Sequence, residues 1–150
     1  MIIAFVVSAA LPADASTSAS CFRDKINAER ASVGRTALVV NSQVVQIAQR
    51  HSERMEHDNT IYHNNNLAGE YAAIGGYEYG GENVGMGPDC ETIHEAFKHS
   101  KGHYLNMVDP DYKQVGVAVV IGDDGTLFVT EDFFTPKVRR PSRSQPQDCR

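Results

Sequence analysis

A change in hydrophobic period near residue 115 constrains the fold of this chain more than any other feature. The odd-numbered residues from 115 to 121 are all valine or isoleucine, whereas Gly116 and Ala118 lie between them. This alternation predicts a strand with one large apolar face and one small-residue face, against which a helix can pack closely. Residues 122–125 (Gly-Asp-Asp-Gly) are a turn signal, so 126–134 are expected to form the return strand of a hairpin.

Upstream of this hairpin, the apolar residues follow the period of a helix. Residues 21–33 are expected to form a helix that is capped by Ser20 and stopped by Gly34. Residues 42–55 carry a clearer apolar stripe, and Pro88-Asp89 opens a third helix. Several helices followed by a late hairpin predict an α+β fold in which helices cover an antiparallel sheet.

Between the second and third helices, residues 57–88 lose this periodicity and gain glycine and asparagine. A long irregular segment in a small domain is usually functional or disordered, so we expect loops there. Four tyrosines crowd the segment: Tyr62, Tyr71, Tyr77 and Tyr79. They either pack the loops onto the body or form an aromatic rim around a ligand.

The two ends of the chain differ from its body. Residues 1–11 are apolar, and Ala13-Asp14-Ala15 follows with the small-x-small pattern of a cleavage site. We therefore expect residues 1–15 to be a signal peptide and the protein to be secreted. No Lys or Arg precedes the apolar run, and a buried N-terminal strand or helix is the alternative. The folded domain is then 16–135, followed by a basic, proline-containing disordered tail over 136–150.

The formal net charge of −5 is distributed unevenly over these parts. Residues 16–135 carry −8, whereas the tail carries +4. An acidic body gives no support for a nucleic-acid partner and makes capture of a cation more plausible. No apolar run reaches the roughly 20 residues of a membrane-spanning helix. The tail is the basic surface that we expect to touch anionic surfaces.

Three cysteines permit three different disulfides and leave one thiol over. They are Cys21, Cys90 and Cys149. We favour the pair Cys21–Cys90, because both lie at expected helix starts, whereas Cys149 lies in the tail. A disulfide agrees with a location outside the cytosol.

Among the six histidines, spacing excludes one familiar zinc motif. His94 and His99 are five residues apart and would diverge on a helix, whereas a zinc-protease helix needs a spacing of four. His51 lies on an apolar stripe and is expected to be a core histidine. No Gly-x-Ser-x-Gly elbow of a serine hydrolase occurs.

Several short motifs, taken in order, resemble the CAP superfamily of cysteine-rich secretory, antigen-5 and pathogenesis-related proteins, especially its short bacterial branch. The matching elements are Asn27-Ala28-Glu29-Arg30, the helix with His51-Ser52 and Met55, Tyr62-His63, Gly81-Glu82-Asn83-Val84, Ala96-Phe97 with Ser100-x-Gly-His103, and the hairpin from Val115 to Phe133. The resemblance covers about residues 21–134. It implies a three-layer α-β-α sandwich with a central antiparallel sheet (the CAP or SCP fold).

The resemblance also implies a central cavity lined by two histidines and two acidic residues. His63, Glu82 and His103 match three of these positions, while Ser100 stands where other members have the second glutamate. Asn83 and Tyr62 neighbour the cavity, and Asn83 is expected to serve a turn.

Two imidazoles and one carboxylate suit Zn²⁺ or another divalent cation, with a fourth position open. Alternatively, His63, Glu82 and His103 hydrogen-bond one another and tie the loops to the sheet. Glu82 is the one candidate catalytic base.

The resemblance implies a secreted protein that acts mainly by binding. Its ligand would be a small apolar molecule, such as a sterol or fatty acid, or another component of the cell envelope. The alternative is an enzyme in which a metal at His63 and His103 activates water, with Glu82 as base, to hydrolyse a peptide or cell-wall bond.

Overall fold

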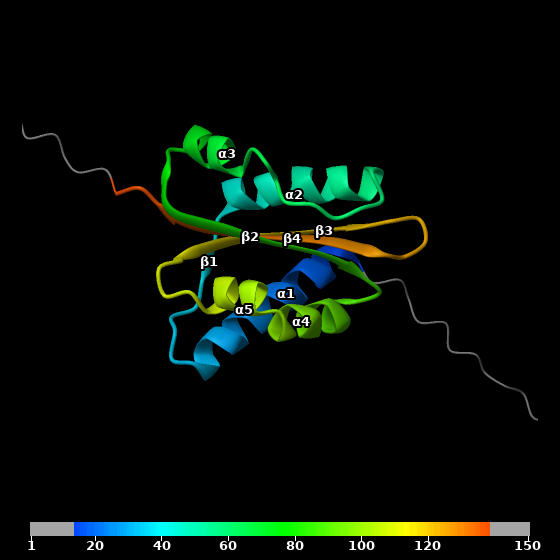
Figure 1. Cartoon of the computed structure of the whole chain (residues 1–150), viewed down its shortest axis with the longest axis horizontal. Helices are drawn as coiled ribbons and strands as arrows, with labels where there is room; N and C mark the ends of the chain where they lie inside the picture. The colour runs from blue at the N-terminus through cyan, green and yellow to red at the C-terminus, as the bar shows by residue number, and fades with distance from the viewer. Residues whose placement is uncertain (1–13, 139–150) are drawn as a thin grey trace, which may run out of the picture.

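The computed structural model describes residues 14–138. Most of the expected leader, and the tail from residue 139, lie outside this range. The described chain forms five helices and four strands (Figure 1). In order they are α1 (Ala15–Ser32), β1 (Val39–Val40), α2 (Ser42–His57), α3 (Leu67–Ala73), β2 (Tyr77–Gly87), α4 (Cys90–His99), α5 (Lys101–Val108), β3 (Gln114–Ile121) and β4 (Leu127–Pro136). No helix within residues 14–138 has the length and apolarity needed to cross a bilayer.

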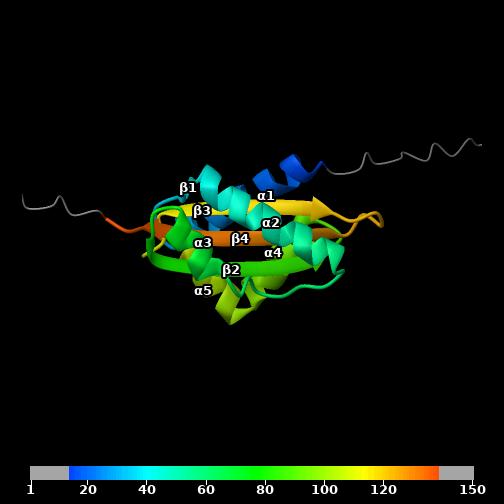
Figure 2. The ribbon, with the colours of Figure 1, turned by 90° about the horizontal axis from the view of Figure 1, so that it is seen from above.

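The strands form one sheet in the order β1-β3-β4-β2, with helices on both of its faces. Helices α2 and α3 cover one face, while α1, α4 and α5 cover the other (Figures 1 and 2). The α-β-α sandwich is thus confirmed. The sheet is mixed, however: β4 is antiparallel to β2 and β3, whereas β1 pairs with β3 in parallel at Val39–Gln114 and Val40–Val115.

The two faces of β3 differ as the alternation predicts. Val115, Val117 and Val119 belong to the main core, on the side of α1 and α4. On the other side, a side chain on Gly116 would overlap the backbone of Val44 and Val45. Glycine at this position therefore lets α2 lie directly on the sheet.

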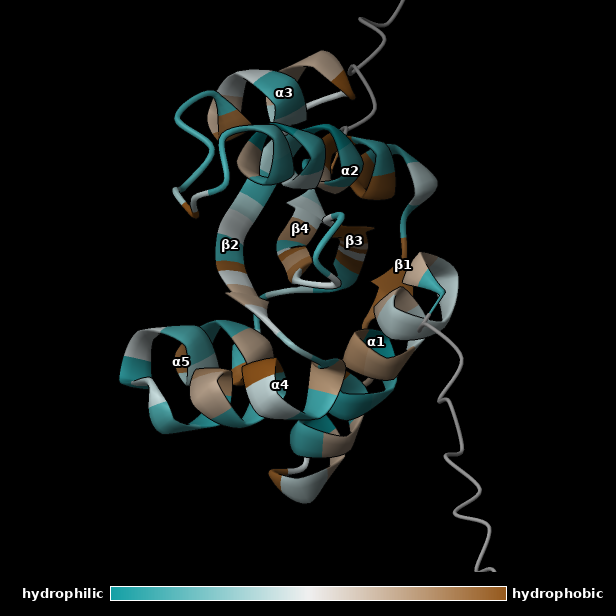
Figure 3. Ribbon diagram, turned by 90° about the vertical axis from the view of Figure 1, so that its right-hand side faces the viewer, coloured by the Kyte–Doolittle hydropathy of each residue, from teal (hydrophilic) through white to brown (hydrophobic). Residues whose placement is uncertain are grey.

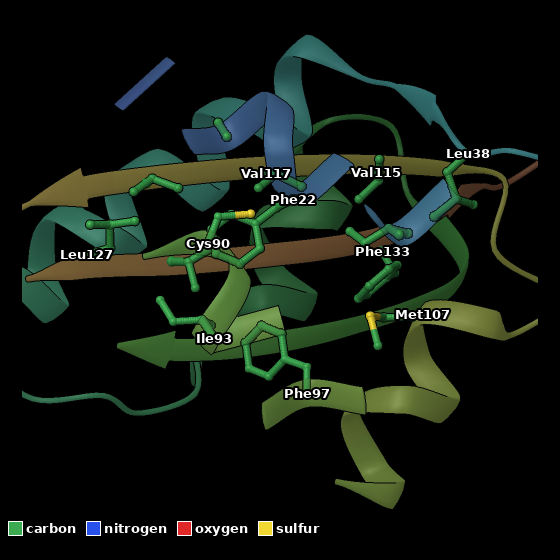
Figure 4. Packing of buried hydrophobic residues seen from close by; sticks show 14 of the residues in the cluster. Phe22, Leu38, Cys90, Ile93, Phe97, Met107, Val115, Val117, Leu127 and Phe133 are labelled. Atoms are coloured by element: carbon green, nitrogen blue, oxygen red, sulfur yellow. The ribbon is translucent and has the colours of Figure 1, made fainter. Parts of the chain in front are cut away.

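The main core fills the space between the sheet and α1, α4 and α5 (Figure 4). Phe22 and Phe133 are completely buried there, and Phe97 and Met107 join them from the helices. Figure 3 shows the apolar residues of β3 and β4 between the two helical layers. β4 pairs with β2 on one side and β3 on the other, and it is buried on both faces.

Helix α1 begins six residues earlier than expected. Its N-cap is Asp14, whose carboxylate accepts a hydrogen bond from the Ser16 amide at 3.3 Å, and not Ser20. Residues 15–20 are small and lack an apolar stripe, which hid the first turns of the helix. Ser18 and Ala19 are nonetheless buried.

The segment expected to be irregular contains helix α3 and the eleven-residue strand β2. Glycines in β2 mark places where rings from other elements lie against the strand. A side chain on Gly80 would come within 2.7 Å of the Tyr71 ring, and one on Gly85 within 2.8 Å of Phe97. The glycines thus indicate close packing on a strand and not a loop.

The disulfide Cys21–Cys90 is confirmed, with the two Cα atoms 6.4 Å apart. It joins α1 to the first residue of α4. The expected location of the two cysteines was half right, because Cys90 begins a helix but Cys21 lies inside one. Cys149 lies outside the described residues.

Candidate functional site

A hydrogen-bonded histidine and glutamate form the centre of the candidate site. His63, in the loop after α2, places Nδ1 2.8 Å from Oε1 of Glu82 on β2. The Asn64 amide donates to the same oxygen at 2.9 Å. The Glu82 side chain is 4% exposed and that of His63 is 64% exposed. Because the carboxylate fixes the proton on Nδ1, Nε2 of His63 is presented to solvent as an acceptor.

His51 on α2 lies beneath this pair, and its interpretation as a core histidine is confirmed. It is 1% exposed, and Nε2 lies 2.6 Å from the Tyr62 carbonyl oxygen. Nε2–H therefore donates to that carbonyl, and Nδ1 accepts from Arg54 at 3.2 Å. Nε2 is also 3.8 Å from Oε2 of Glu82. The His51 imidazole thus joins the loop of Tyr62 to the site.

His103 reaches the site from the opposite helical layer. It lies on α5, with its ring 4.8 Å from that of Phe97, and its buried Nδ1 has no hydrogen-bond partner. Burial lowers the pKa of His103, and the charge of His63 lowers it further. Both effects favour the neutral ring, which is the form that binds metal ions.

Asn83 connects the two sides of the site. It lies within β2 and is completely buried, so its expected place in a turn is wrong. Its amide group donates to the His103 carbonyl at 3.2 Å and to Glu131 at 3.0 Å. It also accepts from Asn106 at 2.9 Å. These bonds hold the start of α5 against the strand that carries Glu82.

Ser100 occupies the N-cap position of α5, but its side chain makes no capping hydrogen bond. A serine here supplies no carboxylate, so Glu82 remains the acidic residue of the expected set.

Tyr62 lies in the wall of a pocket beside His63, and its hydroxyl donates to Asp58 at 2.8 Å. This hydrogen bond raises the pKa of Tyr62.

A pocket of about 290 Å³ opens beside His63. Each residue of its lining carries a polar group: His51, Arg54, Tyr62, His63, Asn64, Asn65, Asn66 and Glu70. Glu70 is held in place by the Asn64 amide at 2.6 Å and by Arg50 at 3.3 Å. The pocket therefore offers fixed donors and acceptors to a ligand.

Two buried carboxyl groups on β4 were missed by the sequence analysis. Asp132 lies opposite Glu82 in the sheet, is completely buried, and has no partner for either oxygen. Burial raises the pKa of Asp132, and the charges of Glu82 and Glu70 raise it further. Glu131 points to the other face, where burial raises its pKa to about 8. The sequence does give one indication of them, because Glu131 and Asp132 are two consecutive acidic residues in the middle of an expected strand.

Raising the pH from 5 to 8 is expected to destabilise the fold, with Glu131 as a main cause. The pKa of Glu131 is about 8 in the folded protein against 4.5 normally. Its contribution to stability is therefore complete below pH 4.5 and is lost as pH rises towards 8. The loss of this one contribution lowers the free energy of unfolding by about 3 kcal/mol between pH 5 and pH 8. Urea titrations of Glu131→Gln at both pH values should show a correspondingly smaller loss.

Glu78→Gln, which removes an exposed carboxylate from β2, controls for the change in net charge. An equal loss of stability in the wild type and in Glu131→Gln would contradict the assignment to this residue.

Within residues 14–138, no three His, Cys, Asp or Glu side chains are grouped as a metal site. The three candidate ligands nonetheless keep atoms free. His63 retains Nε2, and Oε2 of Glu82 and Nδ1 of His103 are buried without partners. The structure brings His63 and Glu82 into contact and leaves metal binding as a prediction.

Comparison with known proteins identifies the family. Residues 23–133 match the family described as CAP, the cysteine-rich secretory protein family. No curated protein sequence matches. Solved structures share the fold, and the three that follow are at 22% identity or less.

An outer surface protein from Borrelia burgdorferi is 15% identical with a TM-score of 0.74, over 83% of this chain and 97% of that one. An extracellular SCP-domain protein from Bacillus anthracis is 22% identical with a TM-score of 0.69, over 80% and 41%. Venom allergen-like protein 4 from Schistosoma mansoni is 15% identical with a TM-score of 0.64, over 86% and 96%. The match over most of the sequence, with a fold shared by extracellular relatives, shows that this chain belongs to the cysteine-rich secretory protein (CAP) family.

Proposed function

We propose that this CAP domain is a secreted binding protein that takes a polar component of the cell envelope in the pocket beside His63. The observation that carries the proposal is the lining of that pocket. A ligand there meets the guanidinium of Arg54, the imidazole of His63 and the amides of three consecutive asparagines, with the Glu70 carboxylate among them.

This lining favours one of the two expected ligand classes. A saccharide or peptide presents both donors and acceptors, which the amide, guanidinium and carboxylate groups can match. A sterol or fatty acid would cover these groups without bonding to them, which costs roughly 1–3 kcal/mol for each. The pocket therefore supports a polar envelope component over a small apolar ligand.

The pair His63–Glu82 gives the pocket its most reactive group. Because Glu82 is buried and bonded to Nδ1, the imidazole keeps one orientation and one tautomer. Its Nε2 can accept a hydrogen bond from a ligand hydroxyl or amide.

A divalent cation would bind to the free atoms of this same group. His63 Nε2 and His103 are the donors available for Zn²⁺, which accepts imidazole ligands, and Glu82 would hold the His63 ring in place through Nδ1. When bound, such an ion would polarise an oxygen of the ligand or of water. In the hydrolase alternative, Glu82 would take the proton of that water.

Binding of a soluble muropeptide, a disaccharide with a short peptide, tests the proposal by calorimetry with and without Zn²⁺. His63→Ala should weaken binding about tenfold, as expected for the loss of one strong hydrogen bond. His99→Ala removes an exposed histidine from α4 and should leave binding unchanged.

Sodium laurate serves as the apolar probe. Binding of laurate that His63→Ala weakens, with no binding of muropeptide, would overturn the proposal. Mass spectrometry of the incubated muropeptide separates binding from catalysis, because cleaved products that vanish in Glu82→Gln would establish the hydrolase instead.

A further inference from the structure

We infer that the groove between α1 and α2, along the free edge of β3, is a docking site for an extended acidic peptide that joins the sheet as an added strand. The groove has a volume of about 310 Å³ and lies apart from His63. It is lined by Ala15, Ser16, Ala19 and Arg23 of α1, Val45 and Gln49 of α2, and residues 117–119 of β3.

The edge of β3 is paired over only a part of its length. The Asn41 amide donates to the Val115 carbonyl at 3.0 Å, so the backbone groups of residue 115 face β1. Backbone groups two residues apart in a strand point the same way, so those of Val117 and Val119 face this edge too. β1 ends at Val40 and α2 begins at Ser42, while β3 continues to Ile121. Among the described residues, no strand lies beside Val117 and Val119 on this edge.

Small side chains leave space beside this edge. Ala15 and Ala19 lie one helical turn apart on α1, opposite Val45 on α2. Figure 3 shows α2 and α1 in the layers on the two sides of β3. Val117 and Val119 are only 1% and 3% exposed. A strand can therefore pair with their backbone groups only when the side chains that line the groove move aside.

The free backbone groups favour a peptide over an aliphatic chain. Buried N–H and C=O groups are almost always paired, and an added strand supplies both partners. A hydrocarbon chain in the same groove would leave them unpaired, at a cost in free energy for each.

Arg23 gives the site its charge preference. Its side chain forms no ion pair or hydrogen bond with another residue in 14–138, whereas Lys25 on the same helix pairs with Glu91. A carboxylate on the bound peptide would supply the missing partner. The apolar walls at Ala19 and Val45 suit aliphatic side chains at the alternate positions.

Calorimetry with the capped peptide Val-Asp-Val-Asp-Val tests the inference. We expect binding of this peptide, and no binding of the same peptide with alternate amides methylated, which cannot pair with a strand. Arg23→Gln should weaken binding about threefold to fivefold, the upper part of the range for an exposed ion pair. Lys101→Gln removes an exposed lysine from α5 and should have no effect.

Hydrogen exchange locates the bound strand. The amides of Val117 and Val119 should exchange more slowly with the peptide present. His63→Ala should change neither the affinity for the peptide nor this protection. Equal binding of the methylated peptide, or unchanged exchange at both valines, would overturn the inference. Binding of sodium laurate to the groove in place of any peptide would overturn it as well. Because the two sites are separate, failure here leaves the proposal for the His63 pocket standing.

Discussion

Replacing Arg30 by methionine is expected to lower the free energy of unfolding by about 4 kcal/mol, because four backbone carbonyls lose their donor. The side chain is 1% exposed. Its guanidinium donates to Thr36 at 2.8 Å, to Met107 at 2.9 Å, to Asp109 at 2.8 Å and to Tyr112 at 3.3 Å. Methionine replaces the aliphatic stem but none of these hydrogen bonds.

The substitution should also destabilise parts of the fold other than α1. Three of the four carbonyls belong to the end of α5 and the segment before β3, to which this side chain connects α1. Urea unfolding measures the change, and a shift of the midpoint with an unchanged slope would assign it to the folded state. Arg35→Met is the matched control, since exposed Arg35 makes a single bond of 3.3 Å to Val108. A loss for Arg30→Met below about 1 kcal/mol, the worth of one hydrogen bond, would contradict the argument.

Arg30 also shows how far the sequence could predict the structure. The motif Asn27-Ala28-Glu29-Arg30 indicated the family but not the task of its residues. Arg30 and Asn27 bind backbone carbonyls, and the partners of Arg30 lie up to 82 residues away. Every residue has a backbone carbonyl, so the sequence does not indicate which of these carbonyls will accept a hydrogen bond from an arginine.

The hairpin was predictable because the residues that determine it are close together in the sequence. Alternation in β3 and the turn at 122–125 determine both strands and the face that receives α2. Strand β2 was not predictable in this way, since its glycines are explained by rings on α3, α4 and the loop before β3. β1 has two exposed residues and owes its pairing to its position beside β3.

The candidate site was predicted in part, through the family resemblance. His63 and Glu82 do meet, and Tyr62 lies beside them. Asp132 could not be found, because its relation to the site depends on the register of β4 against β2. Asn83 was placed in a turn because asparagine is common in turns, whereas tertiary hydrogen bonds retain it inside a strand.

Removing the disulfide through the double variant Cys21→Ser and Cys90→Ser is expected to lower the free energy of unfolding by about 4 kcal/mol. The two cysteines are 69 residues apart in sequence, and a closed loop of that length restricts the unfolded chain strongly. Between them lie β1, α2, α3 and β2, so the bridge limits the unfolded positions of all four elements.

Thermal unfolding should detect this as a fall in Tm of about 10 °C or more, given the usual shift per kcal/mol for domains of this size. Cys149→Ser removes a thiol without touching the bridge and should leave Tm unchanged. Both cysteines also contact the main core, and serine loses those contacts as well as the bond. Reducing the wild type with the thiols kept in place therefore separates the two causes. A reduced wild type as stable as the oxidised one would show that packing, and not the bridge, holds α1 against α4.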